Sequence, residues 1–194
     1  MTRQSFIVKG ALAAGTVYGV ATVAPFVSEA IAQEGAGDVE ILNFALTLEH
    51  LEATFYEQGL KNVSGLGGEA KELATTLHEN EAEHVDALTE AIKGLGGTPA
   101  KAPGVDFGEA FSSQKAFLKT AQTFEDLGVS AYNGAAPNIQ SKEVLGSAGA
   151  IVQVEARHAA AIRQLNDNPI TEAAFDKALE MQEVLSAVKP FVKS

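Results

Sequence analysis

Two short motifs in the chain carry residue types that bind metal ions in proteins. Glu81-Ala82-Glu83-His84 and Glu155-Ala156-Arg157-His158 each place a Glu three residues before a His. In a helix, positions i and i+3 lie on one face, so each pair can hold one cation between a carboxylate and an imidazole. This donor set suits iron and manganese, with zinc as a competitor. One such pair is a weak signal, but two on separate predicted helices form a pattern.

Each pair is preceded by an acidic residue that has a Tyr two helical turns later. Glu49 with Tyr56 precedes the first pair, and Glu125 with Tyr132 precedes the second. Because seven residues are nearly two full turns, each Glu points in nearly the same direction as its Tyr. The lone Glu precedes the Glu of its pair by 32 residues in the first half and by 30 in the second. The chain therefore contains two halves with the same chemistry.

These ionisable residues interrupt stripes of apolar residues, which predicts that they are buried. Four unpaired carboxylates inside a bundle would be strongly disfavoured, whereas two divalent cations would offset their charge. Helical bundles that hold two iron or two manganese ions use this combination of four Glu and two His, so we expect two Fe ions, or alternatively two Mn ions. The predicted metal ligands are Glu49, Glu81, His84, Glu125, Glu155 and His158.

Two further residues could approach this site. Glu52 lies one turn after Glu49 and is the alternative ligand in the first helix. The internal repeat favours Glu49, because Glu52 aligns with Gly128 rather than with another acid. His78 precedes Glu81 by one turn and is interpreted as a partly buried structural residue.

Helical periodicity and turn residues predict an all-α fold. The first two helices are expected at about 38–62 and 68–93. The third begins at 106–109 or a few residues later and ends near 133. The fourth and fifth are expected at about 141–165 and 171–188. Short turns join the first helix to the second and the third helix to the fourth. A long Gly/Pro-containing segment, 94–108, joins these two pairs. This pattern predicts an antiparallel four-helix bundle with one long crossover at 38–166. Residues 167–194 would add a fifth, C-terminal helix packed on the bundle, which could also mediate a homodimer.

Residues 1–32 have the pattern of an export signal. Arg3 and Lys9 precede an apolar run, and Ala30-Ile31-Ala32 offers a cleavage site before a linker at 33–37. The start, Thr2 to Lys9, is similar to a twin-arginine signal with Gln4 in place of the second Arg, so the Tat-like and Sec routes both stay open. We expect an exported protein of the periplasm, the cell envelope or the medium, with membrane attachment only through an uncleaved signal.

Composition excludes several classes of function. The net charge of −11 argues against nucleic acid as a partner. The chain has no Cys, so it can form no iron–sulfur cluster, thiolate zinc site or disulfide.

The motifs resemble the ferritin-like superfamily, including bacterioferritin, rubrerythrin and manganese catalase. More closely, the chain is similar to exported ferritin-like domain proteins linked with desiccation or stress. The resemblance rests on residues 45–52 with Phe55-Tyr56, on 81–84, on 124–132 and on 155–158. It implies that Glu49 and Glu125 are terminal ligands, and that Glu81 and Glu155 bridge the two metals.

The same resemblance implies redox activity. Tyr56 and Tyr132 would then be catalytic residues that hydrogen-bond a ligand or donate an electron, although both could also be core residues. The substrate would be dioxygen or hydrogen peroxide, in a ferroxidase or peroxide-detoxifying reaction with an unidentified electron donor. The alternatives are manganese catalase-like activity and a non-catalytic metal-binding envelope stress protein. The chain differs from rubrerythrins in having no Cys. It differs from cage-forming ferritins in its predicted export signal and fifth helix.

Overall fold

The structure, a computed structural model, describes residues 37–193, so the predicted export signal and most of the linker lie outside it. The described chain is all-helical, which confirms the predicted class. Its α-helices are α3 (Asp38–Asn62), α4 (Gly68–Gly94), α5 (Gln114–Ala135), α6 (Lys142–Leu165) and α7 (Met181–Val188). Short 3-10 helices lie at Gly108–Phe111, Ala136–Asn138 and Lys189–Phe191.

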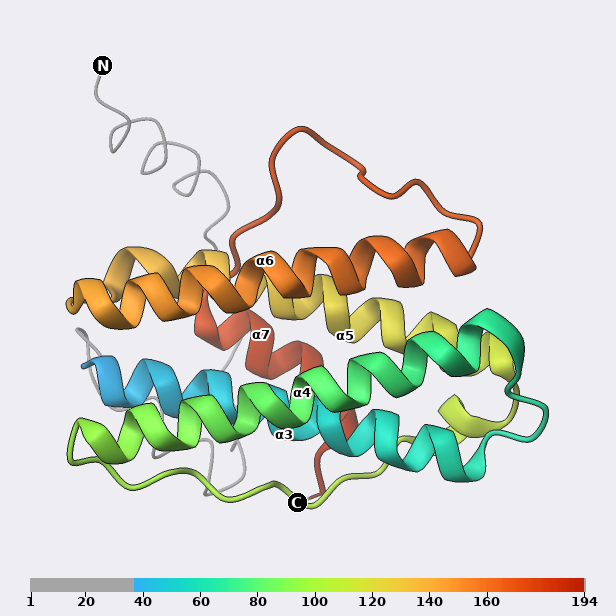
Figure 1. The fold of residues 1–194 in the computed structure, drawn as a ribbon, viewed down its shortest axis with the longest axis horizontal. Coiled ribbons are helices and arrows are strands. Elements are labelled where there is room, and N and C mark those ends of the chain that lie inside the picture. Colours follow the sequence, from blue (N-terminus) through green and yellow to red (C-terminus); the bar gives the residue numbers. More distant parts are fainter. Residues whose placement is uncertain (1–36, 194) are drawn as a thin grey trace.

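The four long helices form a bundle of two helical pairs. α3 packs along α4, and α5 packs along α6, each pair being joined by a short turn (Figure 1). The segment between α4 and α5 is much longer and runs along the bundle to reach the start of α5 (Figure 1). This segment also contacts the C-terminal tail through an isolated antiparallel bridge between Val105 and Val192. The predicted bundle with one long crossover is therefore confirmed.

Side-chain caps begin two of the bundle helices. The Ser113 hydroxyl accepts a hydrogen bond from Ala116 N at 3.1 Å, and the Ser141 hydroxyl accepts one from Val144 N at 3.3 Å. Helix α3 has Gly37, and not the neighbouring Asp38, as its N-cap residue. The Asp38 carboxylate instead accepts hydrogen bonds from Gln140 N and Ser141 N at 2.7 and 2.8 Å. Asp38 thus ties the start of α3 to the start of α6.

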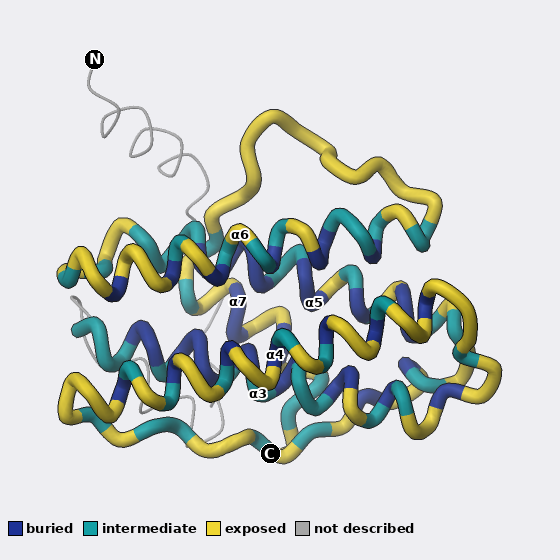
Figure 2. Tube along the Cα trace, viewed as in Figure 1, coloured by how far each residue is buried: buried dark blue, intermediate teal, exposed yellow. Residues whose placement is uncertain are grey.

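The C-terminal helix is shorter than predicted. A helix over 171–188 is wrong, because α7 begins at Met181 and the preceding residues are extended and exposed (Figure 2). The chain leaves the far end of α6 and returns alongside the bundle (Figure 1). An extended chain covers about 3.3 Å per residue and a helix only about 1.5 Å, so the return requires extended backbone. The segment ends on α5, where Leu179 N donates to Ser130 O at 3.0 Å.

Two hydrophobic clusters fill the interior along the bundle axis. The first is rich in aromatic residues and contains Phe55, Tyr56, Phe117 and Phe124, and α7 packs into it. The second is mostly aliphatic and contains Tyr132. The buried inner faces of the four helices follow this axis (Figure 2). Over residues 37–193, no helix combines the length and the apolar character that a membrane crossing requires.

Candidate metal centre

The six residues predicted as metal ligands converge inside the bundle from all four long helices. Each of the four helices contributes one or two of these residues from its buried face: Glu49 from α3, Glu81 and His84 from α4, Glu125 from α5, and Glu155 and His158 from α6. All six are buried, and the side chains of Glu81, Glu125 and Glu155 are fully inaccessible. A buried ionisable group needs a partner, so this convergence requires a chemical explanation.

The six residues form two overlapping groups of four that have metal-site dimensions. In each group, one ligand atom per residue lies within 4.8 Å of all the others. Glu81 and Glu155 belong to both groups. Glu49 and His84 complete the first group, and Glu125 and His158 complete the second. Two cations held in these groups would therefore share two carboxylates.

Each imidazole points its Nδ1 atom at several carboxylates at once. His84 Nδ1 lies 3.2 Å from Glu49 Oε2, 3.1 Å from Glu81 Oε2 and 3.0 Å from Glu155 Oε1. His158 Nδ1 lies 2.9 Å from Glu81 Oε1, but the two atoms are not aligned for a hydrogen bond. A nitrogen with a single proton satisfies one acceptor well, whereas a cation accepts lone pairs from several donors.

Several buried polar atoms of the cluster have no hydrogen-bond partner in the described chain. They are Glu81 Oε1, Glu125 Oε2, both carboxylate oxygens of Glu155, and His158 Nδ1. Buried polar atoms are rarely left unpaired in folded proteins, and a missing ion is one recognised explanation. The donor atoms are carboxylate oxygens and imidazole nitrogens, as iron and manganese sites require. The residues present therefore fit a di-metal centre.

Burial and mutual repulsion change the ionisation of these carboxylates. Burial raises the pKa of Glu49 and of Glu52 well above the ordinary range, and the charge of Glu155 raises both further. Burial likewise raises the pKa of Glu125 to about 8, although contact with His158 opposes that rise. For Glu81, burial is outweighed by contacts with His158 and His84, which lower its pKa.

The imidazoles respond in the opposite sense to the carboxylates around them. Burial disfavours a charge on His84, but Glu155, Glu49 and Glu81 raise its pKa to about 12. His158 has a pKa raised to about 12 for the same reason, with Glu125 and Glu155 as its main partners. The cluster thus favours positive charge at the two Nδ1 positions, where a bound cation would take the place of protons.

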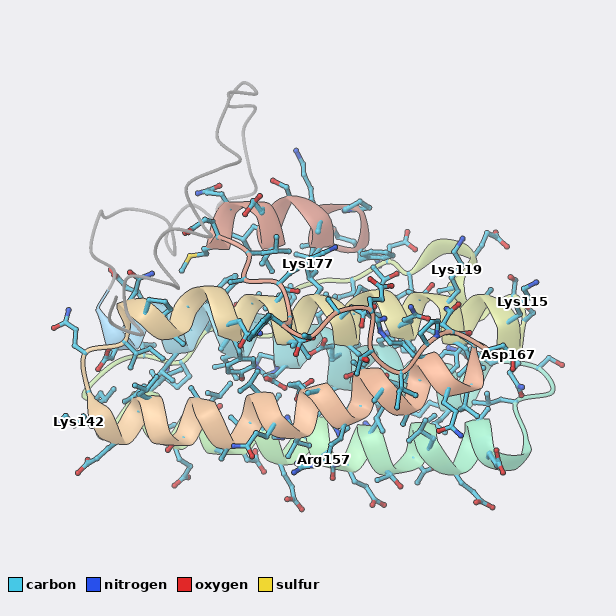
Figure 3. The ribbon with its side chains drawn as sticks, turned by 90° about the horizontal axis from the view of Figure 1, so that it is seen from above. Lys115, Lys119, Lys142, Arg157, Asp167 and Lys177 are labelled. Atoms are coloured by element: carbon cyan, nitrogen blue, oxygen red, sulfur yellow. The ribbon has the colours of Figure 1, made fainter. Side chains whose placement is uncertain are left out.

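Basic side chains do not neutralise the buried acids. In the described part of the chain, the ion pairs of lysine and arginine involve Glu57, Asp126 and Glu172, all outside the cluster. Lys115, Lys119 and Arg157 project from the outer surface of the bundle (Figure 3). The charge balance of the interior is therefore left to protons or metal ions.

The two tyrosines cross between the halves of the site. Tyr56 of the first half donates a hydrogen bond to Glu125 Oε1 of the second half. Tyr132 of the second half donates to Glu49 Oε1 of the first half at 2.5 Å. Each tyrosine thus orients the carboxylate of the opposite half, which the spacing along one helix does not reveal.

Glu52 is a fifth buried carboxylate beside the six residues. It lies outside both groups of four, and 3% of its surface is exposed. A Cβ atom placed on Gly128 would lie 3.3 Å from Glu52 Oε1 and 3.5 Å from Glu155 Oε2. Gly128 therefore leaves the space that Glu52 occupies, which explains why an acid aligns with a glycine in the repeat. His78 is only partly buried and is not in either group.

Asn80 is a site residue that the sequence motifs did not reveal. Its side-chain amide lies 3.0 Å from His158 Nε2, on the side of the ring that faces away from the carboxylates. The only signal in the sequence was its position directly before Glu81. Asn80 reaches His158 because α4 and α6 lie side by side.

Comparison with known families agrees with this fold. A family model described as the ferritin-like domain matches residues 37–168, more than half of the chain. The chain therefore belongs to the ferritin-like domain family. None of the curated proteins compared with the chain matches it.

Proposed function

We propose that this protein binds two iron ions through Glu49, Glu81, His84, Glu125, Glu155 and His158, and reduces dioxygen or hydrogen peroxide. The observation that carries the proposal is the pair of four-residue groups that share Glu81 and Glu155. Two ferrous ions held side by side would supply two electrons together to the oxidant. Four carboxylates with two neutral imidazoles would balance the charge of two divalent cations.

The surrounding residues support this chemistry in distinct ways. Tyr56 and Tyr132 hold the terminal carboxylates Glu125 and Glu49 and place a phenol within reach of each. The two hydrophobic clusters exclude bulk water from both sides of the site, which strengthens electrostatic interactions inside it. An electron donor and a homodimer partner are also part of the proposal.

The exported location is also part of the proposal and rests on residues 1–32 alone. It predicts that the protein recovered from the cell envelope or medium begins at Gln33. N-terminal sequencing of that protein checks the prediction, and a retained Met1 would instead favour an uncleaved anchor.

Elemental analysis of the purified chain tests the metal centre directly. We expect about two iron ions per chain after anaerobic loading, and we expect the Glu81→Ala/Glu155→Ala variant to lose both. The matched control is Glu79→Ala/Glu83→Ala, which removes two exposed carboxylates from α4 and should keep both ions. Manganese in place of iron would favour catalase-like activity, and a chain without either metal would overturn the proposal.

Oxidation kinetics then separate the two oxidants. The iron-loaded chain is mixed with dioxygen or with hydrogen peroxide, and the appearance of ferric absorbance is followed. Faster oxidation by peroxide identifies a peroxide-detoxifying protein, and faster oxidation by dioxygen identifies a ferroxidase. Bound iron that reacts with neither at more than the rate of free iron would leave a non-catalytic metal-binding protein.

A further inference from the structure

The two histidines of the metal centre differ at the nitrogen that faces away from the carboxylates. His158 Nε2 lies 3.0 Å from Asn80 Nδ2, the nitrogen of the side-chain amide. His84 makes its polar contacts through Nδ1, and in the described chain its Nε2 atom has no hydrogen-bond partner. The His84 side chain is also the more exposed of the two, at 11% against 5% for His158.

The internal repeat explains this difference at the level of sequence. Asn80 directly precedes Glu81 on α4, and the equivalent residue on α6, directly before Glu155, is Val154. Because Val has no hydrogen-bonding side-chain group, the second half cannot offer His84 the partner that the first half offers His158.

The outer nitrogen matters because it determines the tautomer of a neutral imidazole. When Nδ1 binds a cation, the ring proton resides on Nε2, and a group that accepts this proton fixes both the tautomer and the ring orientation. In the structure the Asn80 amide presents its nitrogen to Nε2, and a half-turn of the amide would place its oxygen, the acceptor, in the same position. His158 thus has a partner suited to metal binding.

We propose that Asn80 is a positioning residue for His158 and that the two metal subsites are therefore inequivalent. The His158 subsite, formed by Glu81, Glu125, Glu155 and His158, is the tighter one. The His84 subsite, formed by Glu49, Glu81, His84 and Glu155, binds its ion more weakly. This inference rests on the proposed function insofar as two metal ions bind in the cluster.

Titration of the full chain with Co²⁺ tests the inference without any turnover. The visible absorption of cobalt reports its coordination, so the two binding steps can be followed separately. We expect the wild-type chain to bind in a tight and a weaker step. Asn80→Val should weaken the tight step about 10- to 100-fold, as loss of such partners does at other metal sites, and leave the weaker step nearly unchanged. Asn80→Asp keeps an acceptor and should restore the tight step.

A gain-of-function variant provides the matched control. Val154→Asn supplies His84 with the missing amide and should strengthen the weaker step while leaving the tight step unchanged. An unchanged weaker step in this variant would contradict its assignment to the His84 subsite. Thermal unfolding of each variant checks that the bundle still folds.

The possible failures are distinguishable. A wild-type chain that binds no cobalt would overturn the proposed function and, with it, the inference. The inference alone would be overturned if Asn80→Val left both cobalt affinities at their wild-type values. It would also be overturned if the variant weakened both sites equally. A larger loss in Asn80→Asp than in Asn80→Val would also overturn it, because the acceptor would then be irrelevant.

Discussion

At the scale of single residues, the centre is held by contacts that join the two halves of the chain. Tyr132 binds Glu49 and Tyr56 binds Glu125, so each half orients a ligand of the other. Glu52 occupies the space that Gly128 leaves. Substitutions here should therefore affect both the metal site and the interior that surrounds it.

Removal of the Tyr132 hydroxyl should destabilise the folded chain. In Tyr132→Phe, the buried carboxylate oxygen Glu49 Oε1 loses its hydrogen-bond donor, and we expect a cost of about 1.5–3 kcal/mol in the free energy of unfolding. Urea denaturation of the metal-free chain measures this cost. Thr123→Val on the same helix removes an exposed hydroxyl and should change stability by less than about 0.5 kcal/mol. Equal effects of the two variants would contradict the role assigned to Tyr132.

Metal binding should release protons, because the imidazole pKa values lie far above neutrality. Surrounding carboxylates overcome burial to raise the pKa of His84 and of His158 to about 12, so both rings carry protons in the metal-free chain at pH 7. The apparent affinity for Mn²⁺ should therefore rise as pH rises from 6 to 8, by about tenfold per pH unit for each proton displaced. Calorimetry in two buffers of different ionisation enthalpy measures the protons released. A heat that is independent of the buffer would refute this coupling.

At the scale of secondary-structure elements, the extended segment before α7 depends on a close approach to α5. Leu179 O lies 1.8 Å from the position that a Cβ atom on Gly134 would occupy. Asn133 Nδ2 donates to Lys177 O at 3.3 Å, next to this contact. The absence of a side chain at Gly134 therefore allows the segment to reach α5 and to place α7 in the core.

Gly134→Ala should displace this segment. We expect a loss of about 1–3 kcal/mol in the free energy of unfolding, because backbone must move to admit the methyl group. Hydrogen exchange should show reduced protection over α7 and the residues before it. Gly149→Ala in α6 is the matched control, since its Cβ would meet nothing within 4 Å and the change should stabilise the helix by about 0.5–1 kcal/mol. Unaltered protection of α7 in Gly134→Ala would contradict this account.

At the scale of the whole molecule, the charges of the buried cluster make stability depend on pH. Burial raises the folded-state pKa of Glu125 to about 8 and that of Glu49 and Glu52 well above the ordinary range. Groups with raised pKa values bind protons more tightly in the folded state than in the unfolded state. For a carboxyl, stability is then lost as pH rises from its unfolded pKa towards its folded one. The histidines act in the same direction above about pH 6.5.

The metal-free chain should therefore be less stable at pH 8 than at pH 5.5. Bound metal replaces the protons and should reduce or reverse this trend, because it neutralises the carboxylates at every pH where it stays bound. Thermal unfolding with a chelator, and then with excess Mn²⁺, measures both effects. A metal-free chain that gains stability from pH 5.5 to 8 would contradict the electrostatic account of the cluster.

The inward-facing side chains, the helix ends and the bundle topology could be predicted from the sequence, because local rules determine them. A helix places i, i+3 and i+7 on nearly one face, so the repeated Glu, Tyr and Glu-x-x-His spacing predicted which side chains point inward. Turn residues marked the helix ends, and the lengths of the connections predicted the bundle with one long crossover. The convergence of the six candidate ligands followed from the need to pair buried charge.

Other features depend on contacts between segments far apart in the chain, and only the tertiary structure decided them. Asn80 contacts His158 because α4 and α6 lie side by side, and Asp38 accepts hydrogen bonds from the residues that precede α6 rather than capping its own helix. The residues before α7 have a composition compatible with helix, yet they are extended because the chain must return along the bundle. Local propensity contributes less than about 1 kcal/mol per residue, so packing and chain reach determine the outcome wherever they compete with it.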